Sequence, residues 1–243
     1  MKLFCANCRC KARSINTALI ICISNKIRAL QPDIAVFDEI VIEGTNFQTE
    51  ISNLGYDVRS SRPIKGRNQV VIAVKAGIKV GGPENCNSDS VMEPDYLQLI
   101  VEKGGQKYNI IGFRMLVGGE IEKDFKERKE IFDNFVCRIN LPKSAITIII
   151  GDFNNGRYLP SVERYKGLPQ EPYNYQYIER ELKSKLKLEP VDNIKSRSNS
   201  SLGSLHEDHC FISEEAFCKV RSYTFQDWKC GNFDHRYLYV DIA

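Results

Sequence analysis

Apolar positions along the chain repeat with two different periods. Between residues 15 and 30 they return every three to four residues, which predicts an amphipathic helix after a short strand at residues 2–7. Residues 34–37 and 145–150 are short continuous apolar runs, which predict strands buried on both faces. A chain that alternates helices with buried strands is typical of the α/β class.

The remaining pattern predicts more strands than helices. Lys-Gly-Gly-Gln at residues 103–106 separates two apolar segments and is typical of a hairpin turn. No repeat and no linker divides the chain, so we expect one domain over residues 1–243, with two sheets packed face to face and helices outside. The other helices are expected at residues 45–54, 120–139 and 175–188, and the other strands at residues 56–59, 69–75, 96–102, 107–115, 209–213, 218–225 and 236–242.

Composition and charge narrow the class of protein without identifying a partner. The chain has 243 residues, of which 42% are hydrophobic and 27% charged, values that are ordinary for one globular domain. A net charge of +3 neither requires nor excludes a nucleic-acid partner. No apolar run reaches the roughly 18 residues that a membrane crossing needs, so we expect no membrane association.

The nine cysteines are an odd number, which cannot pair completely within the chain. We therefore expect reduced thiols and a cytoplasmic location. Cys5, Cys8 and Cys10 resemble half of a zinc site, but no second Cys/His group with suitable spacing follows them. The apolar run at residues 18–24 follows basic residues, as in a secretory signal, but it lacks a convincing small-residue cleavage site.

Polar residues with useful chemistry gather where the apolar strands end. Strand ends are rigid, and a catalytic site needs side chains that the scaffold holds in place. Carboxylates and amides in this number suit a hard cation such as Mg²⁺ or Mn²⁺. Taken singly, each cluster is also explained as the polar end of a strand or as a helix cap. The clusters are Asn7, Asp38 with Glu39, Asp152 with Asn154, Glu207 with Asp208 and His209, and Asp234 with His235.

The order of these clusters resembles that of the endonuclease/exonuclease/phosphatase superfamily, which has the DNase I-like fold. The matching motifs run from Asn7 to Val240 and span nearly the whole chain. The resemblance implies a four-layer α/β sandwich of two packed mixed β-sheets flanked by helices, and metal-assisted hydrolysis of a phosphate ester. The motifs are Asn7 after the first strand, Pro32-Asp33-Ile34 with Glu39, Gly151-Asp152-Phe153-Asn154, Asp208-His209 followed by Phe211-Ile212-Ser213, and Asp234-His235-Arg236.

By position, the resemblance assigns metal binding to Glu39, with help from Asn7 and Asp234. A phosphodiester is anionic and repels a nucleophile, so such a site needs a cation that neutralises charge in the transition state. Neutral Asn7 can contact a metal or a phosphate oxygen without adding the repulsion of a further carboxylate. The cofactor that we expect is therefore Mg²⁺, with Mn²⁺ as the alternative.

The resemblance assigns the reaction steps to four other residues. Asp152 orients or deprotonates the attacking water, and Asn154 steadies the phosphoryl oxygens. His235 hydrogen-bonds the phosphate or transfers a proton, while Asp208 holds its imidazole. The charge of a neighbouring carboxylate raises the pKa of a histidine, which favours the protonated form at neutral pH.

Three positions depart from the family pattern. Ala6 stands where a tryptophan often precedes the first-strand asparagine, and Arg9 stands where AP endonucleases of the family carry an aspartate. Arg114 ends a strand where relatives place a histidine or tyrosine against the scissile phosphate. An arginine can clamp a phosphate there, although it cannot serve as a general acid. The alternative is that Arg114 is an ordinary solvated strand end.

Two further histidines and the single tryptophan have simpler explanations. His206 and His209 lie beside Asp208, and we expect both to be bystanders. Successive side chains of a strand point to opposite faces, so His209 should point away if Asp208 points into the site. Trp228 either stacks on a base or sugar of the substrate or packs under its loop.

Three functions follow from this reading. The first is a divalent-metal-dependent phosphodiesterase, an endo- or exonuclease acting as a monomer, with DNA favoured over RNA. The second is a phosphomonoesterase, or a phospholipid or small-molecule phosphoesterase, that uses the same site. The third is a catalytically inactive binding module of the same fold, which would not need so many polar strand ends. The slightly basic charge and the lack of an apolar membrane-facing segment favour nucleic acid.

Overall fold

Twelve strands, four α-helices and one 3₁₀ helix form the described part of the computed structural model. It describes residues 1–10, 13–88, 90, 92–116, 122–155, 173–191, 207–230 and 233–243. In chain order the elements are β1 (Lys2–Asn7), α1 (Thr17–Leu30), β2 (Ile34–Ile40), α2 (Phe47–Asn53), β3 (Tyr56–Ser60), β4 (Gln69–Lys75), β5 (Lys79–Cys86), β6 (Asp95–Lys103), β7 (Gln106–Arg114), α3 (Glu122–Arg138), β8 (Ile146–Asp152), α4 (Tyr175–Leu186), β9 (Leu188–Pro190), β10 (Asp208–Ser213), η3 (Glu214–Lys219), β11 (Val220–Gln226) and β12 (Tyr237–Ile242).

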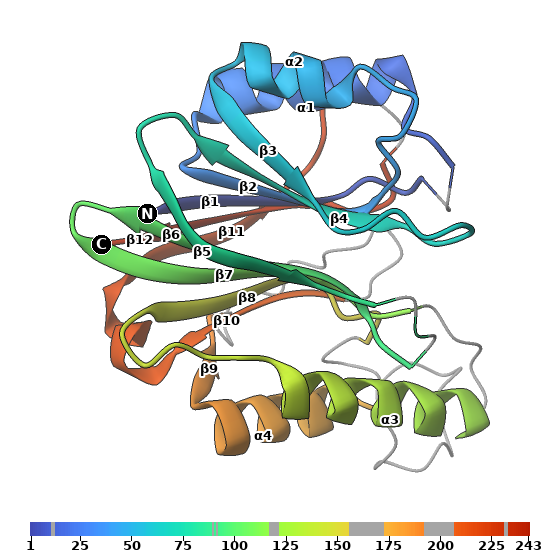
Figure 1. Ribbon diagram of the computed structural model, residues 1–243, viewed down its shortest axis with the longest axis vertical. Helices are drawn as coiled ribbons and strands as arrows, with labels where there is room; N and C mark the ends of the chain where they lie inside the picture. Colours follow the sequence, from blue (N-terminus) through green and yellow to red (C-terminus); the bar gives the residue numbers. More distant parts are fainter. Residues whose placement is uncertain are drawn as a thin grey trace.

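The strands form two six-stranded sheets that pack face to face (Figure 1). The first sheet has the order β11-β12-β1-β2-β4-β3, and the second has the order β5-β6-β7-β8-β10-β9. In the first sheet β1 and β2 are parallel, and in the second β7 and β8 are parallel, whereas the other neighbours are antiparallel. Both sheets are therefore mixed.

Helices cover the outer faces of both sheets. Figure 1 shows α1 and α2 over the first sheet and α3 and α4 over the second. Three apolar clusters fill the spaces between these layers, one between the sheets and one between each sheet and its helices. The expected four-layer α/β sandwich is confirmed. Among the helices that the structure describes, none is both long and apolar enough to cross a membrane.

Alternation within the strands decides which side chains fill which layer. In β8, Ile148 and Ile150 lie in the cluster between the sheets, whereas Ile149 faces the helices. The sheets pack tightly around Gly112 of β7, where a Cβ atom would lie 2.6 Å from Cγ1 of Val70 on the opposite sheet. A glycine is therefore needed at this point of the inter-sheet core.

The first and last strands of the chain are neighbours. Strand β12 pairs antiparallel with β1, with Leu3 opposite Val240, and the two termini lie close together in Figure 1. This pairing sets the end of β1 beside the start of β12. The fold thereby brings the first and the last of the predicted polar clusters to the same edge of the first sheet.

Most elements lie close to their predicted positions, with informative exceptions. Helix α1 begins at Thr17 because Asn16 caps it, its side-chain oxygen accepting a hydrogen bond from the Leu19 N–H at 3.0 Å. The pattern did not predict β5, whose glycines and proline are typical of a turn, or β9, which has three residues directly after α4. Both are edge strands of the second sheet.

Candidate active site

Polar side chains replace apolar ones at one end of the inter-sheet core. In β8, Asp152 takes the inward-facing position that follows a run of isoleucines. The same alternation places Asn7 of β1, Asp38 of β2 and Asp208 of β10 between the sheets, each at most 2% exposed. Because β1 and β2 end together and β10 starts opposite the end of β8, these side chains lie at one edge of the sandwich.

Glu39 reaches this edge through a local break in β2. Its φ is 47°, in the left-handed region that non-glycine residues seldom adopt. The pairing of β2 with β4 also shifts in register between Phe37 and Ile40. A bulge of this kind turns a side chain away from the face that regular alternation would give it. Glu39 therefore lines the same pocket as its inward-facing neighbours.

The pocket has a volume of about 490 Å³ and is lined by six of the eight predicted site residues. The other two, Asn7 and Asp208, lie behind the wall and hydrogen-bond residues that line it. The fold thus brings together all eight residues from both sheets. The six in the wall are Glu39, Arg114, Asp152, Asn154, Asp234 and His235.

His235 and Asp208 form a hydrogen-bonded pair, with 2.7 Å between Nδ1 and Oδ2. Burial lowers the pKa of His235, but the charge and hydrogen bond of Asp208, with the charges of Asp152 and Glu207, raise it well above its usual value. The neighbouring carboxylates therefore favour the protonated form of the imidazole. Its Nε2 lies 4.0 Å from Oε2 of Glu207, beyond hydrogen-bond distance, and can donate to a ligand in the pocket.

Asp152 is held by hydrogen bonds to both of its oxygens. Oδ2 accepts from Nδ2 of Asn7 at 2.9 Å, and Oδ1 accepts from the backbone N–H of Asn154 at 2.7 Å. Asn154 adopts a φ of 48° and donates from Nδ2 to the carbonyl of Met115 at 2.6 Å. Burial and the charge of Asp208 raise the pKa of Asp152 well above its usual value. A cation in the pocket would counter both effects.

The donor set of the pocket fits a divalent cation. Oxygens of Asp152 and Asp208 lie within 4.8 Å of each other and of a ring nitrogen of His235. Because the imidazole is bonded to Asp208 and serves as a donor, the carboxylates are the groups that suit a cation. Oδ1 of fully buried Asp38 and Oδ1 of Asp234 have no hydrogen-bond partner among the described residues. Unsatisfied carboxylate oxygens in a buried acidic cluster are the ligands that Mg²⁺ and Mn²⁺ prefer.

Asp234 and Asn7 both contact Arg9, which the family pattern does not have at this position. Nε of Arg9 lies 2.8 Å from Oδ2 of Asp234, and the Arg9 backbone N–H donates to Oδ1 of Asn7 at 2.9 Å. Arg9 itself has a φ of 52°. An arginine therefore already neutralises one of the two residues that were expected to help Glu39 hold a metal.

Arg114 is buried, so the interpretation as a solvated strand end is wrong. The residue as a whole is 6% exposed. Its guanidinium donates from Nη2 to Oε1 of Glu39 at 2.5 Å, and from Nη1 to Oδ2 of Asp95 at 3.0 Å. Burial lowers the pKa of Arg114, but the charges of Glu39 and Asp95 raise it above its usual value. The guanidinium therefore stays charged inside the pocket wall.

Asp38, Asp95 and Arg67 belong to the site: Asp38 is in a predicted polar cluster without an assigned role, whereas Asp95 and Arg67 are in none of the predicted clusters. Burial and the charges of Asp208 and Glu39 raise the pKa of Asp38 well above its usual value. Asp95 is fully buried and pairs with Arg67 and Arg114. Alternation could have revealed both aspartates, because each lies in register with the inward-facing apolar residues of its strand.

Solved structures of other proteins superpose on this chain over nearly its whole length. No family model and no curated protein matches the sequence. An AP endonuclease from Archaeoglobus fulgidus superposes with a TM-score of 0.75 at 15% identity, covering 100% of this chain and 99% of that chain. The human Nocturnin catalytic domain with a bound sulfate gives 0.71 at 17%, covering 100% and 93%. D. rerio TDP2 in complex with a single-strand DNA product gives 0.65 at 14%, covering 99% and 97%.

The chain has the DNase I-like fold. The motif order had predicted this fold, and full-length superposition on several solved structures confirms it. Their low sequence identity explains why a comparison of sequences alone finds no relative.

The structure supports the simpler explanations of His209 as a bystander and of Trp228 as a residue that packs under its loop in this DNase I-like fold. His209 is 1% exposed and points to the helix side of β10, where its ring lies 4.8 Å from that of Tyr175. Trp228 stacks on Phe233 at 3.9 Å and packs edge-on against Phe4, so it packs under its loop. His206, the other expected bystander, lies outside the described residues.

All nine cysteines lie in the described part, and none forms a disulfide. Cys5, Cys8 and Cys10 are buried in apolar clusters. Burial raises the pKa of Cys10 to about 11, which disfavours the thiolate that zinc requires. The resemblance to half of a zinc site is therefore explained by packing.

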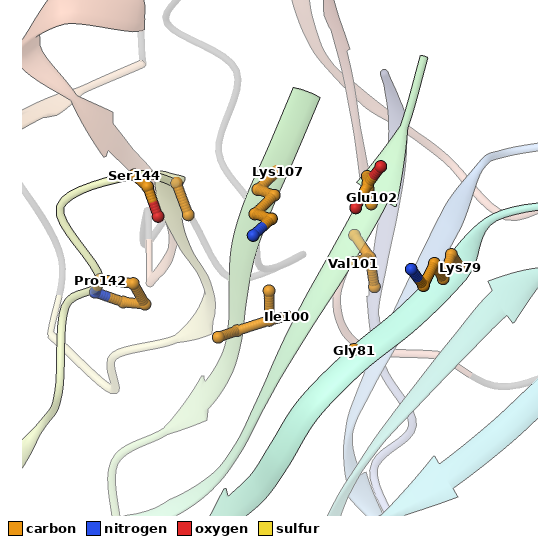
Figure 2. Close-up of a pocket in the computed structure, with 9 residues that line it drawn as sticks. Lys79, Gly81, Ile100, Val101, Glu102, Lys107, Pro142 and Ser144 are labelled. Atoms are coloured by element: carbon orange, nitrogen blue, oxygen red, sulfur yellow. The ribbon is translucent and has the colours of Figure 1, made fainter. Parts of the chain in front are cut away.

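A second hollow of about 230 Å³ lies at the opposite end of the second sheet (Figure 2). Figure 2 shows Lys79, Glu102 and Lys107 on three adjacent strands along it. Glu102 lies opposite Lys79 on one side and Lys107 on the other. These opposite charges stabilise strand pairing, and the hollow contains none of the predicted site residues.

Proposed function

We propose that the chain is a divalent-metal-dependent phosphodiesterase that hydrolyses phosphodiester bonds in nucleic acid. One observation carries the proposal: His235, held by Asp208, faces the same pocket as an anchored Asp152. A positioned donor opposite a carboxylate that can activate water is the minimum that phosphate ester hydrolysis needs. The A. fulgidus AP endonuclease and D. rerio TDP2 with its DNA product share the fold, which supports nucleic acid as substrate.

In the reaction, Asp152 accepts a hydrogen bond from the attacking water and takes its proton as the water oxygen adds to phosphorus. The bond from phosphorus to the leaving oxygen breaks, and that oxygen takes up a proton from water. Asn7 and the Asn154 backbone fix the carboxylate for this step. His235 donates from Nε2 to a phosphoryl oxygen, while Asp208 stabilises its positive charge. Arg114 supplies a second, permanently charged donor from the end of β7.

Glu39 would hold the divalent cation, together with Asp234 and Asn7 as the family pattern implies. A bound Mg²⁺ or Mn²⁺ neutralises negative charge on the phosphoryl group and on the leaving oxygen. Both hydrogen bonds from Arg114 reach Oε1 of Glu39, so this guanidinium does not engage Oε2. Arg9 shares Asp234 and compensates part of its charge.

Nucleic acid is favoured over a small phosphate ester. Three arginines, Arg9, Arg67 and Arg114, lie in the wall of an open pocket of about 490 Å³. Each of these arginines pairs with a carboxylate of the wall, so the preference for a polymer rests on the openness of the pocket and on the fold shared with proteins that act on DNA. DNA is our preferred polymer because the TDP2 neighbour was solved with a single-strand DNA product. We further propose that the protein acts as a monomer in the cytoplasm.

A substrate panel tests the proposal. Purified protein is incubated with plasmid, single-stranded DNA, RNA and a small phosphate monoester, each with Mg²⁺ or with EDTA. Mg²⁺-dependent cleavage of a DNA substrate is the expected result. Turnover of the monoester without cleavage of any polymer would replace the proposal by the phosphatase alternative, and no turnover at all would favour the binding module.

A further inference from the structure

Arg114 is held between carboxylates from two different sheets. Nε and Nη2 donate to Oε1 of Glu39, on β2 of the first sheet, at 3.2 and 2.5 Å. Nη1 donates to Oδ2 of Asp95, on β6 of the second sheet, at 3.0 Å. The Arg114 and Asp95 side chains are 7% and 0% exposed. The guanidinium thus bridges the two sheets in the wall of the pocket.

Asp95 is fixed in turn by Arg67. Nε of Arg67 donates to Oδ1 of Asp95 at 2.9 Å, and Nη2 lies 2.6 Å from the same oxygen. The other donors of Arg67 reach the carbonyl of Ser90 at 2.9 Å and that of Glu93 at 2.8 Å. Since each nitrogen of Arg67 already has a protein acceptor, Arg67 anchors Asp95.

Arg114, unlike Arg67, keeps N–H bonds that can bind a ligand. A guanidinium has five N–H bonds, and three from Arg114 go to Glu39 and Asp95. Two N–H bonds therefore remain on a group that lines the catalytic pocket. Without Asp95, Glu39 would be the only carboxylate among the described residues that hydrogen-bonds Arg114, and the guanidinium could turn fully onto it.

We propose that Asp95 is a positioning residue, which holds Arg114 away from full closure onto Glu39 so that its remaining N–H bonds bind the phosphoryl group of the substrate. Arg67 completes this arrangement by fixing Asp95. The inference rests on the proposed function in taking phosphate as the ligand. In this arrangement Arg114, held by Asp95 and Arg67, contacts the scissile phosphate at the position where relatives place a histidine or tyrosine.

Binding of inorganic phosphate tests the inference without requiring turnover. Isothermal titration calorimetry at fixed Mg²⁺ compares wild type, Asp95→Asn, Arg114→Met and the double variant. We expect Asp95→Asn to weaken phosphate binding by about tenfold or more, because hydrogen bonds to charged groups are the strong ones. In the Arg114→Met background the same change should have no further effect. Equal weakening in both backgrounds, or wild-type affinity in Asp95→Asn, would overturn the inference.

Steady-state kinetics supply the second readout. Asp95→Asn should change kcat and KM in the same ratio as Arg114→Met, whereas a loss of folded protein would lower the apparent kcat alone. The matched control is Asp57→Asn, which removes an exposed aspartate paired with Arg59 on the edge strand β3 and should leave both constants unchanged. An Asp95→Asn variant that behaves like Asp57→Asn rules the inference out.

Arg67→Gln is the variant to use if Asp95→Asn does not fold. It removes the anchor of Asp95 and keeps the aspartate, and it should weaken phosphate binding in the same direction with a smaller fold-change. Wild-type affinity in Arg67→Gln would count against the inference. If the variants follow the expected order but no nucleic acid is cleaved, the positioning role stands and the proposed function fails.

Discussion

At the scale of single residues, the chemistry of the site depends on which groups keep their protons. His235 carries a charge because buried acids surround it, and Asp208 contributes most to that effect. Arg114 carries a charge at every pH at which the fold survives. The pocket therefore has one donor that titrates and one that does not. Loss of activity in alkali should come from the histidine.

Replacement of Asp208 by Asn should move this alkaline limb to lower pH. Asp208 raises the pKa of His235, so its removal lets the pKa fall toward the ordinary histidine value of about 6.5. The protonated fraction at neutral pH then drops, and with it the rate. The pH profile of kcat and the NMR titration of the His235 ring protons should shift together. If the pH profile of kcat were unchanged in Asp208→Asn, a group other than His235 would be responsible for the loss of activity at alkaline pH.

At the scale of elements, strand alternation decides which residues can meet. It predicts that His209 points away if Asp208 points into the site, as the structure shows, and the buried strand at residues 145–150 predicts the polar end that Asp152 provides. It also placed the predicted residues at strand ends, where the fold collects them. Local sequence thus contained most of the information about the strands that carry the site.

Contacts of long side chains could not be predicted in the same way. The Arg114 guanidinium reaches Glu39 on the other sheet, and its position depends on how the two sheets pack. The pair of Arg9 and Asp234 depends on the pairing of β1 with β12, the first and last strands. Glu39 reaches the pocket through a bulge between Phe37 and Ile40, a segment without a glycine or proline that could have indicated the bulge. Such contacts arise from tertiary packing.

Gly112 tests how closely the sheets pack behind the site. In Gly112→Ala the new methyl group would lie 2.6 Å from Cγ1 of Val70 and 2.9 Å from Cγ1 of Val36. We expect this overpacking to lower the free energy of unfolding by about 1–3 kcal/mol. Urea denaturation measures the change. Gly81→Ala is the control, because no atom lies within 4 Å of its added Cβ, and equal destabilisation of both variants would argue against tight packing at Gly112.

At the scale of the whole molecule, the site joins both sheets and both ends of the chain. Asn7 comes from the first strand and His235 from just before the last, while Asp152 and Asp208 come from the second sheet. A cation bound among these groups would therefore link elements that otherwise meet through apolar packing. Metal binding should be visible in the stability of the folded protein as well as in activity.

Addition of Mg²⁺ should raise the Tm of the metal-free protein. A ligand at one hundred times its dissociation constant stabilises the native state by about 2.7 kcal/mol, which corresponds to several degrees for a chain of this size. Glu39→Gln should lose most of this increase relative to its own metal-free Tm. Differential scanning calorimetry measures both. An equal Mg²⁺ effect in the two proteins would place the metal away from Glu39.

Metal-dependent hydrolysis of nucleic acid at this pocket is tested most directly by the cleavage rate of an end-labelled single-stranded DNA oligonucleotide, in Mg²⁺ and in EDTA. We predict cleavage by wild type in Mg²⁺ alone, and a rate lower by at least about 10²-fold in Asp152→Asn. Asp57→Asn, at an exposed position outside the pocket, should match wild type. Cleavage that persists in EDTA, or that Asp152→Asn leaves unchanged, would contradict a metal-dependent hydrolysis at this site.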